Sequence, residues 1–163
     1  MNEVGSKGLL KVENNKANYN IISFGKRFEN LAISVKSQII GSKLSTFEAN
    51  VKSGSKIFLH CGSQIWGLAT VIGNYQYNQS KVWSNDLYPH RYNIKVDLLT
   101  LQPLHLSNGI YNVQLREQFG SGWAYKFIFS PRPLPGDVGE KIEKDLRTAP
   151  TCDLETFLSA IKG

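Results

Sequence analysis

The chain has 163 residues, a formal net charge of +6, 41% hydrophobic residues and 20% charged residues. This length is typical of one domain with a buried core, and the composition excludes an intrinsically disordered chain. No apolar run approaches the ~20 residues of a membrane-spanning helix, and the polar N-terminus lacks the apolar stretch of a signal peptide. Two cysteines, Cys61 and Cys152, are too few for a disulfide scaffold, so we expect a cytoplasmic protein with no membrane partner.

The first third of the chain predicts one strand and two helices. Residues 1–18 are polar and predict a flexible arm, and residues 18–24 are apolar enough for a first strand. Over residues 26–40 apolar side chains recur at spacings of three and four, which predicts an amphipathic helix that ends at Gly41. A short helix is expected over residues 46–52, because the preceding sequence matches a capping box.

The middle of the chain predicts mainly strands. Strands are expected over residues 56–61 and 65–75, joined by a tight turn, and over residues 91–98, where apolar and polar side chains alternate. A long polar loop separates the last two. A helix is expected over residues 107–119 and another strand over residues 123–130. Short links between successive strands favour antiparallel pairing.

The C-terminal part begins with three prolines between residues 131 and 135. Helices are then expected over residues 137–147 and 153–162, each opened by an aspartate suited to N-capping. This order of elements predicts an α+β fold, a curved and mostly antiparallel β-barrel or half-barrel flanked by helices. We expect an arm over residues 1–18, a domain over residues 19–135, and a helical extension or linker over residues 136–163.

The sequence lacks the common catalytic and metal-binding motifs. It has no glycine-rich phosphate loop, no G-x-S-x-G and no H-E-x-x-H, and His60, His90 and His105 lack the spacing of metal ligands. We therefore expect a binding protein with neither catalytic activity, nor a metal, nor a cofactor.

The net positive charge lies in the first hundred residues, which hold 12 Lys or Arg and 6 Asp or Glu, whereas the remainder holds 7 of each. A basic half favours a nucleic-acid partner. Within it, residues 74–93 place five aromatic residues among amides, with Trp83 in the middle of the predicted loop. An indole there is suited to stack on a nucleobase while Lys81 and Arg91 hold phosphates. Alternatively, these aromatic side chains pack on the domain or bind a partner protein.

Three segments in this region resemble a known family. They are K-S-G-S-K-I-F-L at residues 52–59, W-G-L-A at residues 66–69, and W-S-N-D-L-Y-P-H-R at residues 83–91. Together they resemble the EVE domain, a relative of the YTH domain in the PUA-like superfamily, over roughly residues 19–130. The resemblance implies a curved barrel that holds an extruded base in an aromatic-lined pocket. Relatives read methylated bases, in RNA for YTH proteins and in DNA for EVE-like readers fused to McrB-type restriction machinery.

The resemblance also implies site residues. Trp83 matches the tryptophan of the base cage, and Leu87 or Tyr88 matches the residue that closes it. Ile40 stands where many relatives carry a second cage tryptophan, which leaves the second wall to Ile40, Phe24 or Trp66. The full set of pocket candidates is Trp83, Leu87, Tyr88, Ile40, Ser23, Asn20, Phe24 and Trp66. The candidates for contacts with the nucleic-acid backbone are Lys43, Lys56, Lys81, Arg91 and Arg116.

For several of these candidates a local role is the alternative. Ser23 and Asn20 either bind the edge of a base or cap the backbone. Trp66 either forms the second wall or packs in the core. Each lysine is either a phosphate contact or an ordinary solvated charge.

The sequence therefore predicts a reader of a flipped, methylated DNA base that targets a modification-dependent restriction system, with a restriction effector or GTPase module as a possible partner. The main alternative is an RNA-binding module of the same type that recognises a modified base in RNA. A small enzyme that acts on a nucleotide and a protein-interaction domain are further alternatives.

Overall fold

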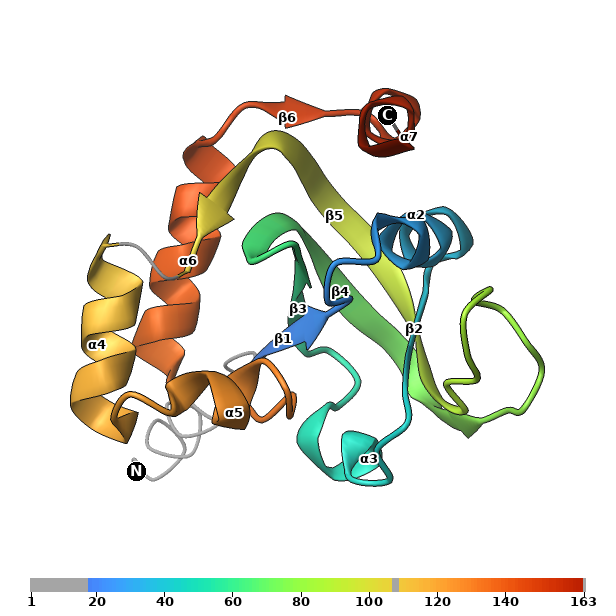
Figure 1. Cartoon of the computed structure of the whole chain (residues 1–163), viewed down its shortest axis with the longest axis horizontal. Coiled ribbons are helices and arrows are strands. Elements are labelled where there is room, and N and C mark those ends of the chain that lie inside the picture. The colour runs from blue at the N-terminus through green and yellow to red at the C-terminus, as the bar shows by residue number, and fades with distance from the viewer. Residues whose placement is uncertain (1–17, 107–108, 163) are drawn as a thin grey trace, which may run out of the picture.

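The computed structural model describes residues 18–106 and 109–162 (Figure 1). The predicted arm lies, except for Asn18, outside this range. A single curled sheet has the strand order β1-β3-β4-β5-β2, and a short strand, β6, pairs with β5. Strands β1 and β3 are parallel, and the remaining pairs are antiparallel. This confirms the predicted α+β fold with a curved, mostly antiparallel half-barrel. The strands are β1 (Tyr19–Ser23), β2 (Ile39–Ser42), β3 (Lys56–Cys61), β4 (Gln64–Tyr77), β5 (His90–His105) and β6 (Thr151–Cys152).

Helices flank the sheet on both sides. Helix α2 connects the two edge strands β1 and β2 and packs beside α7, whereas α4 and α6 pack together at the opposite side of the sheet (Figure 1). The helices are α2 (Phe28–Ser37), α3 (Phe47–Asn50), α4 (Gly109–Phe119), α5 (Trp123–Phe127), α6 (Gly136–Thr148) and α7 (Leu154–Lys162).

Two hydrophobic cores lie on the two faces of the sheet. Successive side chains of a strand point to opposite faces, so Ile57 of β3 joins Leu31 of α2 in one core while Phe58 joins Ile142 of α6 in the other. Each fully buried side chain of this size contributes about 1.5–3 kcal/mol. The C-terminal helices belong to these cores, since α7 buries Phe157 in the first and α6 buries three side chains in the second.

Two of the predicted helix and strand assignments are wrong. The helix predicted to reach Ile40 ends at Ser37, because Gln38 adopts a left-handed conformation (φ 55°) and the chain then pairs with β5 as strand β2. Residues 123–130, predicted as a strand, contain helix α5 (Trp123–Phe127) and no strand. Trp123 and Phe127 lie one helical turn apart and are both buried, a spacing that the aromatic, β-prone composition conceals.

The predicted caps are partly wrong. The N-cap of α3 is Thr46, not the serine of the capping box predicted over residues 45–48, and it makes no side-chain cap bond. Helix α6 begins after Pro135, so Asp137 lies in its first turn rather than at the cap. The cap of α7 is as predicted, since the backbone N–H of Thr156 donates to Asp153 Oδ1 at 2.8 Å.

No helix among the described residues is long and apolar enough to cross a membrane. Within residues 18–106 and 109–162, no cluster of three or more His, Cys, Asp or Glu side chains is arranged to hold a metal ion. Both cysteines are free, and burial raises the pKa of the Cys61 thiol to about 11.

Candidate functional site

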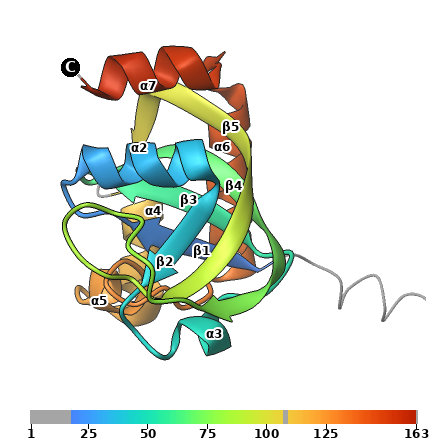
Figure 2. The same ribbon diagram turned by 90° about the vertical axis from the view of Figure 1, so that its right-hand side faces the viewer.

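A pocket of about 280 Å³ opens between the end of β1, the start of α2, strand β2 and the loop of residues 78–89. Figure 2 shows this loop beside α2 and β2. Three aromatic side chains contribute to its walls, and its lining includes two exposed cations from the β1–α2 segment. The lining residues are Ile22, Ser23, Phe24, Gly25, Lys26, Arg27, Asn30, Gly41, Trp83 and Tyr88.

Trp83 is a fixed wall of this pocket. Its side chain is only 2% exposed, and its indole Nε1 donates a hydrogen bond to the Ser34 hydroxyl of α2 at 2.9 Å. The Tyr88 ring meets the indole edge-on with 5.4 Å between ring centres, and the Arg91 guanidinium lies over the indole at 5.3 Å from its centre. Arg91 thus covers one face of the indole, and Trp83 also belongs to the pocket lining. These contacts hold the ring in place before any ligand arrives.

Gly41 makes room for this arrangement. A Cβ atom at this position would lie 2.6 Å from Cη2 of Trp83 and 2.9 Å from Cβ of Tyr88. The two aromatic side chains thus occupy the space that a side chain at position 41 would need. The glycine serves close approach in a strand rather than the helix end that its sequence context predicts.

Residues of the W-x-x-D-L-Y-P-x-R segment hold the loop of residues 78–89 in its folded conformation. Arg91 is 1% exposed and links both ends of the loop: Nε donates to the Tyr88 carbonyl at 2.8 Å, Nη1 donates to the Ser80 hydroxyl at 3.0 Å, and Nη2 donates to the Ser80 carbonyl. Asp86 pairs with Lys43 next to β2, and this hydrogen bond lowers the pKa of Asp86 and raises that of Lys43. The lysine also lies over the Tyr88 ring at 5.6 Å.

Asn30 is a pocket residue that the sequence interpretation missed. Its Nδ2 donates to Asn85 Oδ1 at 2.7 Å, and Asn85 Nδ2 in turn donates to the Tyr88 hydroxyl at 2.8 Å. Its Oδ1 is buried and has no hydrogen-bond partner in the part of the chain that the structure describes. A buried acceptor without a partner costs about 1–3 kcal/mol, so such a group in a pocket lining points to a ligand that donates.

A signal for Asn30 was present in the sequence. Asn30 and Ser34 are spaced four apart on the same helical face as Leu31 and Val35, and all four are buried. Polar residues on the apolar face of a helix require partners. Both now have roles at the pocket, Ser34 as the anchor of the indole and Asn30 as the free acceptor.

His60 lies behind the pocket. Its Nδ1 is 3.0 Å from the Ser23 hydroxyl, which also accepts a hydrogen bond from the Gly25 backbone N–H at 3.1 Å. Burial lowers the pKa of His60 to about 4 from an ordinary value of 6.5. Between about pH 4 and pH 6.5 the imidazole of His60 is therefore protonated more readily in the unfolded chain than in the folded chain.

We expect acidification to destabilise the protein through His60. Stability falls as pH decreases from about 6.5 towards 4, by as much as about 3 kcal/mol at roughly 1.4 kcal/mol per unit of pKa difference. Urea unfolding at pH 7 and pH 4.5 measures this loss. The loss should shrink in His60→Asn and persist in the control His105→Asn, which alters an exposed histidine. An equal loss in His60→Asn would contradict the assignment.

The structure brings four of the eight predicted pocket residues to the pocket. They are Trp83, Tyr88, Phe24 and Ser23. Leu87 lies in the same loop but outside the lining, and Ile40 is fully buried in the core beside β5.

The other two predicted pocket residues have local partners. Trp66 packs edge-on against Phe28 and Phe157, and its Nε1 donates to the Cys61 carbonyl at 2.8 Å. Asn20 is buried, and its Nδ2 donates to two backbone carbonyls, at 2.9 Å and 2.7 Å, in α3 and in the proline segment.

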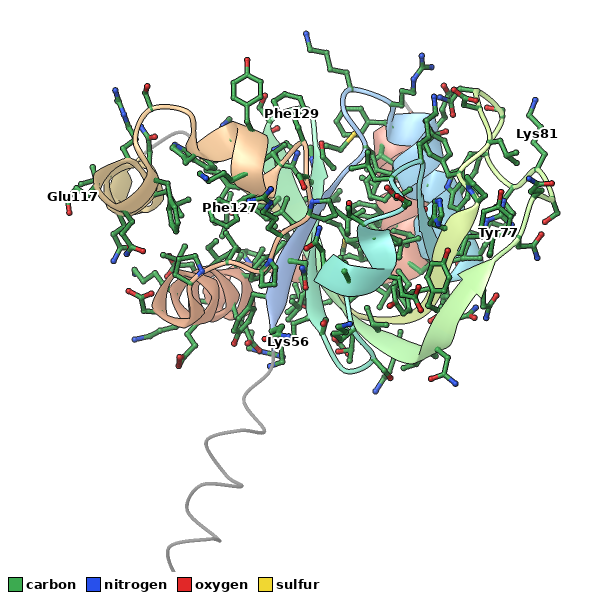
Figure 3. All side chains as sticks on the ribbon, turned by 90° about the horizontal axis from the view of Figure 1, so that it is seen from below. Lys56, Tyr77, Lys81, Glu117, Phe127 and Phe129 are labelled. Atoms are coloured by element: carbon green, nitrogen blue, oxygen red, sulfur yellow. The ribbon has the colours of Figure 1, made fainter. Side chains whose placement is uncertain are left out.

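The five predicted backbone contacts lie in different surroundings. Lys43 pairs with Asp86, Lys56 pairs with Glu143 at 2.9 Å, and Arg91 is buried inside the loop. Lys81 is exposed on the loop (Figure 3). Arg116 is exposed on α4, at the opposite side of the molecule from the loop (Figure 1).

No protein-family model matches the chain, and no curated protein matches it. Solved structures of YTH domains, by contrast, match the chain in fold. The YTH domain of Zygosaccharomyces rouxii MRB1 protein, in complex with N6-methyladenosine RNA, superposes with a TM-score of 0.55 at 15% identity, over 84% of this chain and 91% of that one. The Pho92 YTH domain in complex with m6A gives 0.55 at 15% identity, over 84% and 90% of the two chains.

A bacterial structure shares the fold as well. Protein Atu2648 from Agrobacterium tumefaciens gives a TM-score of 0.50 at 15% identity, over 84% of this chain and all 100% of that one. At these identities the likeness establishes the fold. The predicted YTH-related fold is thereby confirmed.

Proposed function

We propose that the chain is a reader without catalytic activity that binds a flipped, methylated base of a nucleic acid in the pocket of Trp83, Tyr88 and Phe24. The observation that carries this proposal is an aromatic pocket whose lining includes Asn30, a residue with a buried Oδ1 that has no hydrogen-bond partner among the described residues. Stacking on an aromatic wall contributes about 1–3 kcal/mol per base. The volume of about 280 Å³ lies just below the range of roughly 300–1,000 Å³ for drug-sized ligands and suits a single base.

The free acceptor defines the class of base. Asn30 Oδ1 accepts a hydrogen bond from an exocyclic amine, which adenine, cytosine and guanine carry and which keeps one N–H after a single methylation. The added methyl group contributes about 0.8 kcal/mol when it is buried against apolar walls. A doubly methylated amine has lost its donor and would leave the oxygen unpartnered. A base with a singly methylated amine is therefore the ligand that uses both features of the pocket.

Two kinds of nucleic acid compete as the carrier of that base. RNA is supported by the two YTH neighbours with the fold of this chain, which were solved with N6-methyladenosine RNA or m6A. DNA, with a restriction effector or GTPase module as partner, is supported by the resemblance of residues 83–91 to EVE-like readers. The pocket chemistry is common to both, because both polymers carry the same amine.

A matched set of oligonucleotides tests the proposal. Single and double strands of RNA and DNA are compared as unmodified, N6-methyladenine and 5-methylcytosine forms at low salt, by fluorescence anisotropy. We expect preference for N6-methyladenine over the plain base, and the preferred polymer identifies the carrier. Absence of binding to every member of the set overturns the proposal.

Asn30→Leu should remove the selectivity that the amine confers. The wild type is expected to bind a singly methylated adenine about 10- to 100-fold more tightly than a doubly methylated one, since an unmet acceptor costs about 1–3 kcal/mol. The variant should bind both alike. Gln114→Leu is the matched control, because it removes from α4, outside the pocket lining, another buried oxygen that has no partner among the described residues. Equal wild-type affinity for the two bases would refute the role of Asn30.

A further inference from the structure

Helix α5 and the residues after it expose a pair of aromatic side chains. Tyr125 is 74% exposed and Phe129 is 68% exposed, the largest fractions among the large hydrophobic side chains that the structure describes. Their ring centres are 5.3 Å apart, with 32° between the ring planes. Trp123 and Phe127, by contrast, are buried on the opposite side of the same helix. The segment therefore presents a two-ring surface that the core does not require.

Positive charge accompanies these rings. Residues 118–136 contain no Asp or Glu. Lys126 and Arg132 are exposed, and both line a groove of about 710 Å³ between α3 and the proline segment. Exposed aromatic rings on a segment that carries cations and no carboxylates match single-stranded nucleic acid, whose bases stack and whose phosphates need positive partners.

The ring pair lies on the same side of the molecule as the pocket. Figure 2 shows α5 and the loop of residues 78–89 on one side of the sheet, and Figure 3 shows Phe129 and Lys81 along one edge, with the β1–α2 segment between α5 and the loop. Both the β1–α2 segment and the loop line the pocket. A strand whose base enters the pocket can therefore continue over the same face towards α5.

We propose that Tyr125 and Phe129 form a stacking platform for an unpaired base that flanks the flipped one, with Lys126 and Arg132 contacting the phosphates of the same strand. The proposal rests on the proposed base-reading function for the position of the strand and extends it to a second contact site. The pocket selects the modified base, and the platform increases affinity for a single strand without regard to sequence, because every base has a face that stacks.

The double variant Tyr125→Ala/Phe129→Ala tests the platform. Affinities are measured for a nine-nucleotide single strand with a central N6-methyladenine and for the N6-methyladenosine nucleoside. Removal of stacking should weaken binding of the strand by about tenfold or more and leave binding of the nucleoside unchanged. Ile72→Ala is the control, because it removes another exposed apolar side chain, 47% exposed, from β4. Both side chains of the pair are mostly solvated, so the variant should fold.

A fluorescent base locates the contact directly. 2-Aminopurine placed at each of the three positions on either side of the modified base should be quenched at one position or more by the wild type and not by the double variant. Lys126→Gln should weaken strand binding and lower its salt dependence, whereas Lys144→Gln, on α6, should not.

The outcomes separate the platform from the pocket. The platform is overturned if the wild type and the double variant show equal affinity for the strand and equal quenching. It is also overturned if the double variant changes the oligomeric state but not the affinity for the strand, because the two rings would then be a contact between copies of the chain. A wild type that binds no single strand also overturns it. Plain and methylated strands bound alike, with both weakened in the double variant, would support the platform and overturn the reading of a modified base.

Discussion

Trp83→Ala is expected to lower the free energy of unfolding by about 3–5 kcal/mol and to abolish discrimination between methylated and plain bases. The indole is almost fully buried, so its removal leaves a cavity. It also leaves the Ser34 hydroxyl without the indole donor and removes the edge contact to Tyr88. The same ring lines the pocket and is the stacking wall that we propose for the base. Stability and selectivity are therefore both expected to fall.

Two further variants keep this test interpretable if Trp83→Ala folds poorly. Trp83→Phe keeps an aromatic face and loses the hydrogen bond to Ser34, so discrimination should be reduced but present. Trp83→Leu fills part of the volume without a π-face, so discrimination should disappear while more stability is kept. Urea unfolding and oligonucleotide anisotropy measure the two effects.

Trp66→Ala is the matched control for the tryptophan series. It removes a half-buried tryptophan that packs against Phe28 and Phe157, outside the pocket lining. It should therefore reduce stability and leave discrimination unchanged. Discrimination that survives in a folded Trp83→Leu protein would show that the indole is not the wall.

The strands were predictable from the sequence because their signals are local. β3 reads as an apolar run since it is buried on both faces, and residues 91–98 of β5 alternate as a strand covered on one face does. The end of α2 was not predictable, because the pairing of Ile39–Ser42 with β5 is a contact with residues some fifty positions later. Helix α5 was missed because its aromatic residues favour strands, whereas its spacing of buried residues is helical.

The site was predictable as a segment and not as a set of contacts. The W-x-x-D-L-Y-P-x-R pattern located Trp83 and Tyr88, which line the pocket. The same pattern gave no means of telling a cation that meets a ligand from one that holds the loop. Arg91 bonds to backbone and hydroxyl oxygens at both loop ends, a role that depends on how the loop folds back over itself. Asn30 could not be assigned to the pocket from the sequence, because that assignment depends on which face of α2 meets the loop.

These contacts describe a pocket whose rigidity comes from the loop itself. Trp83 and Tyr88 line the pocket, and Asp86 pairs with Lys43, directly after β2. Arg91 joins the loop ends while it covers one face of the indole. Because the walls are fixed beforehand, a base would lose little binding energy to the ordering of side chains. Among the described residues of the pocket lining, Asn30 is the one with a buried oxygen that has no hydrogen-bond partner. Selectivity is thus expected to depend on the amine of the base and affinity on the aromatic walls.

Gly41→Ala is expected to disrupt the pocket by pushing Trp83 and Tyr88, two of its lining side chains, out of place. The new methyl group would lie 2.6 Å from the indole and 2.9 Å from Tyr88 Cβ, so both side chains must shift. The indole cannot move freely, because it donates a hydrogen bond to the Ser34 hydroxyl and lies under the Arg91 guanidinium. Overpacking of this kind costs about 1–3 kcal/mol, and the displaced rings should reduce affinity for the methylated base at least about tenfold.

A second crowded glycine provides the control for this prediction. A Cβ atom at Gly139 of α6 would lie 2.3 Å from the Tyr19 ring in the other core. Gly139→Ala should therefore lower the unfolding free energy, as Gly41→Ala does, and leave discrimination between methylated and plain bases intact. Urea unfolding and anisotropy on both variants separate loss of stability from loss of the site. If Gly41→Ala discriminates as the wild type does, the position of Trp83 against β2 does not determine recognition of the base.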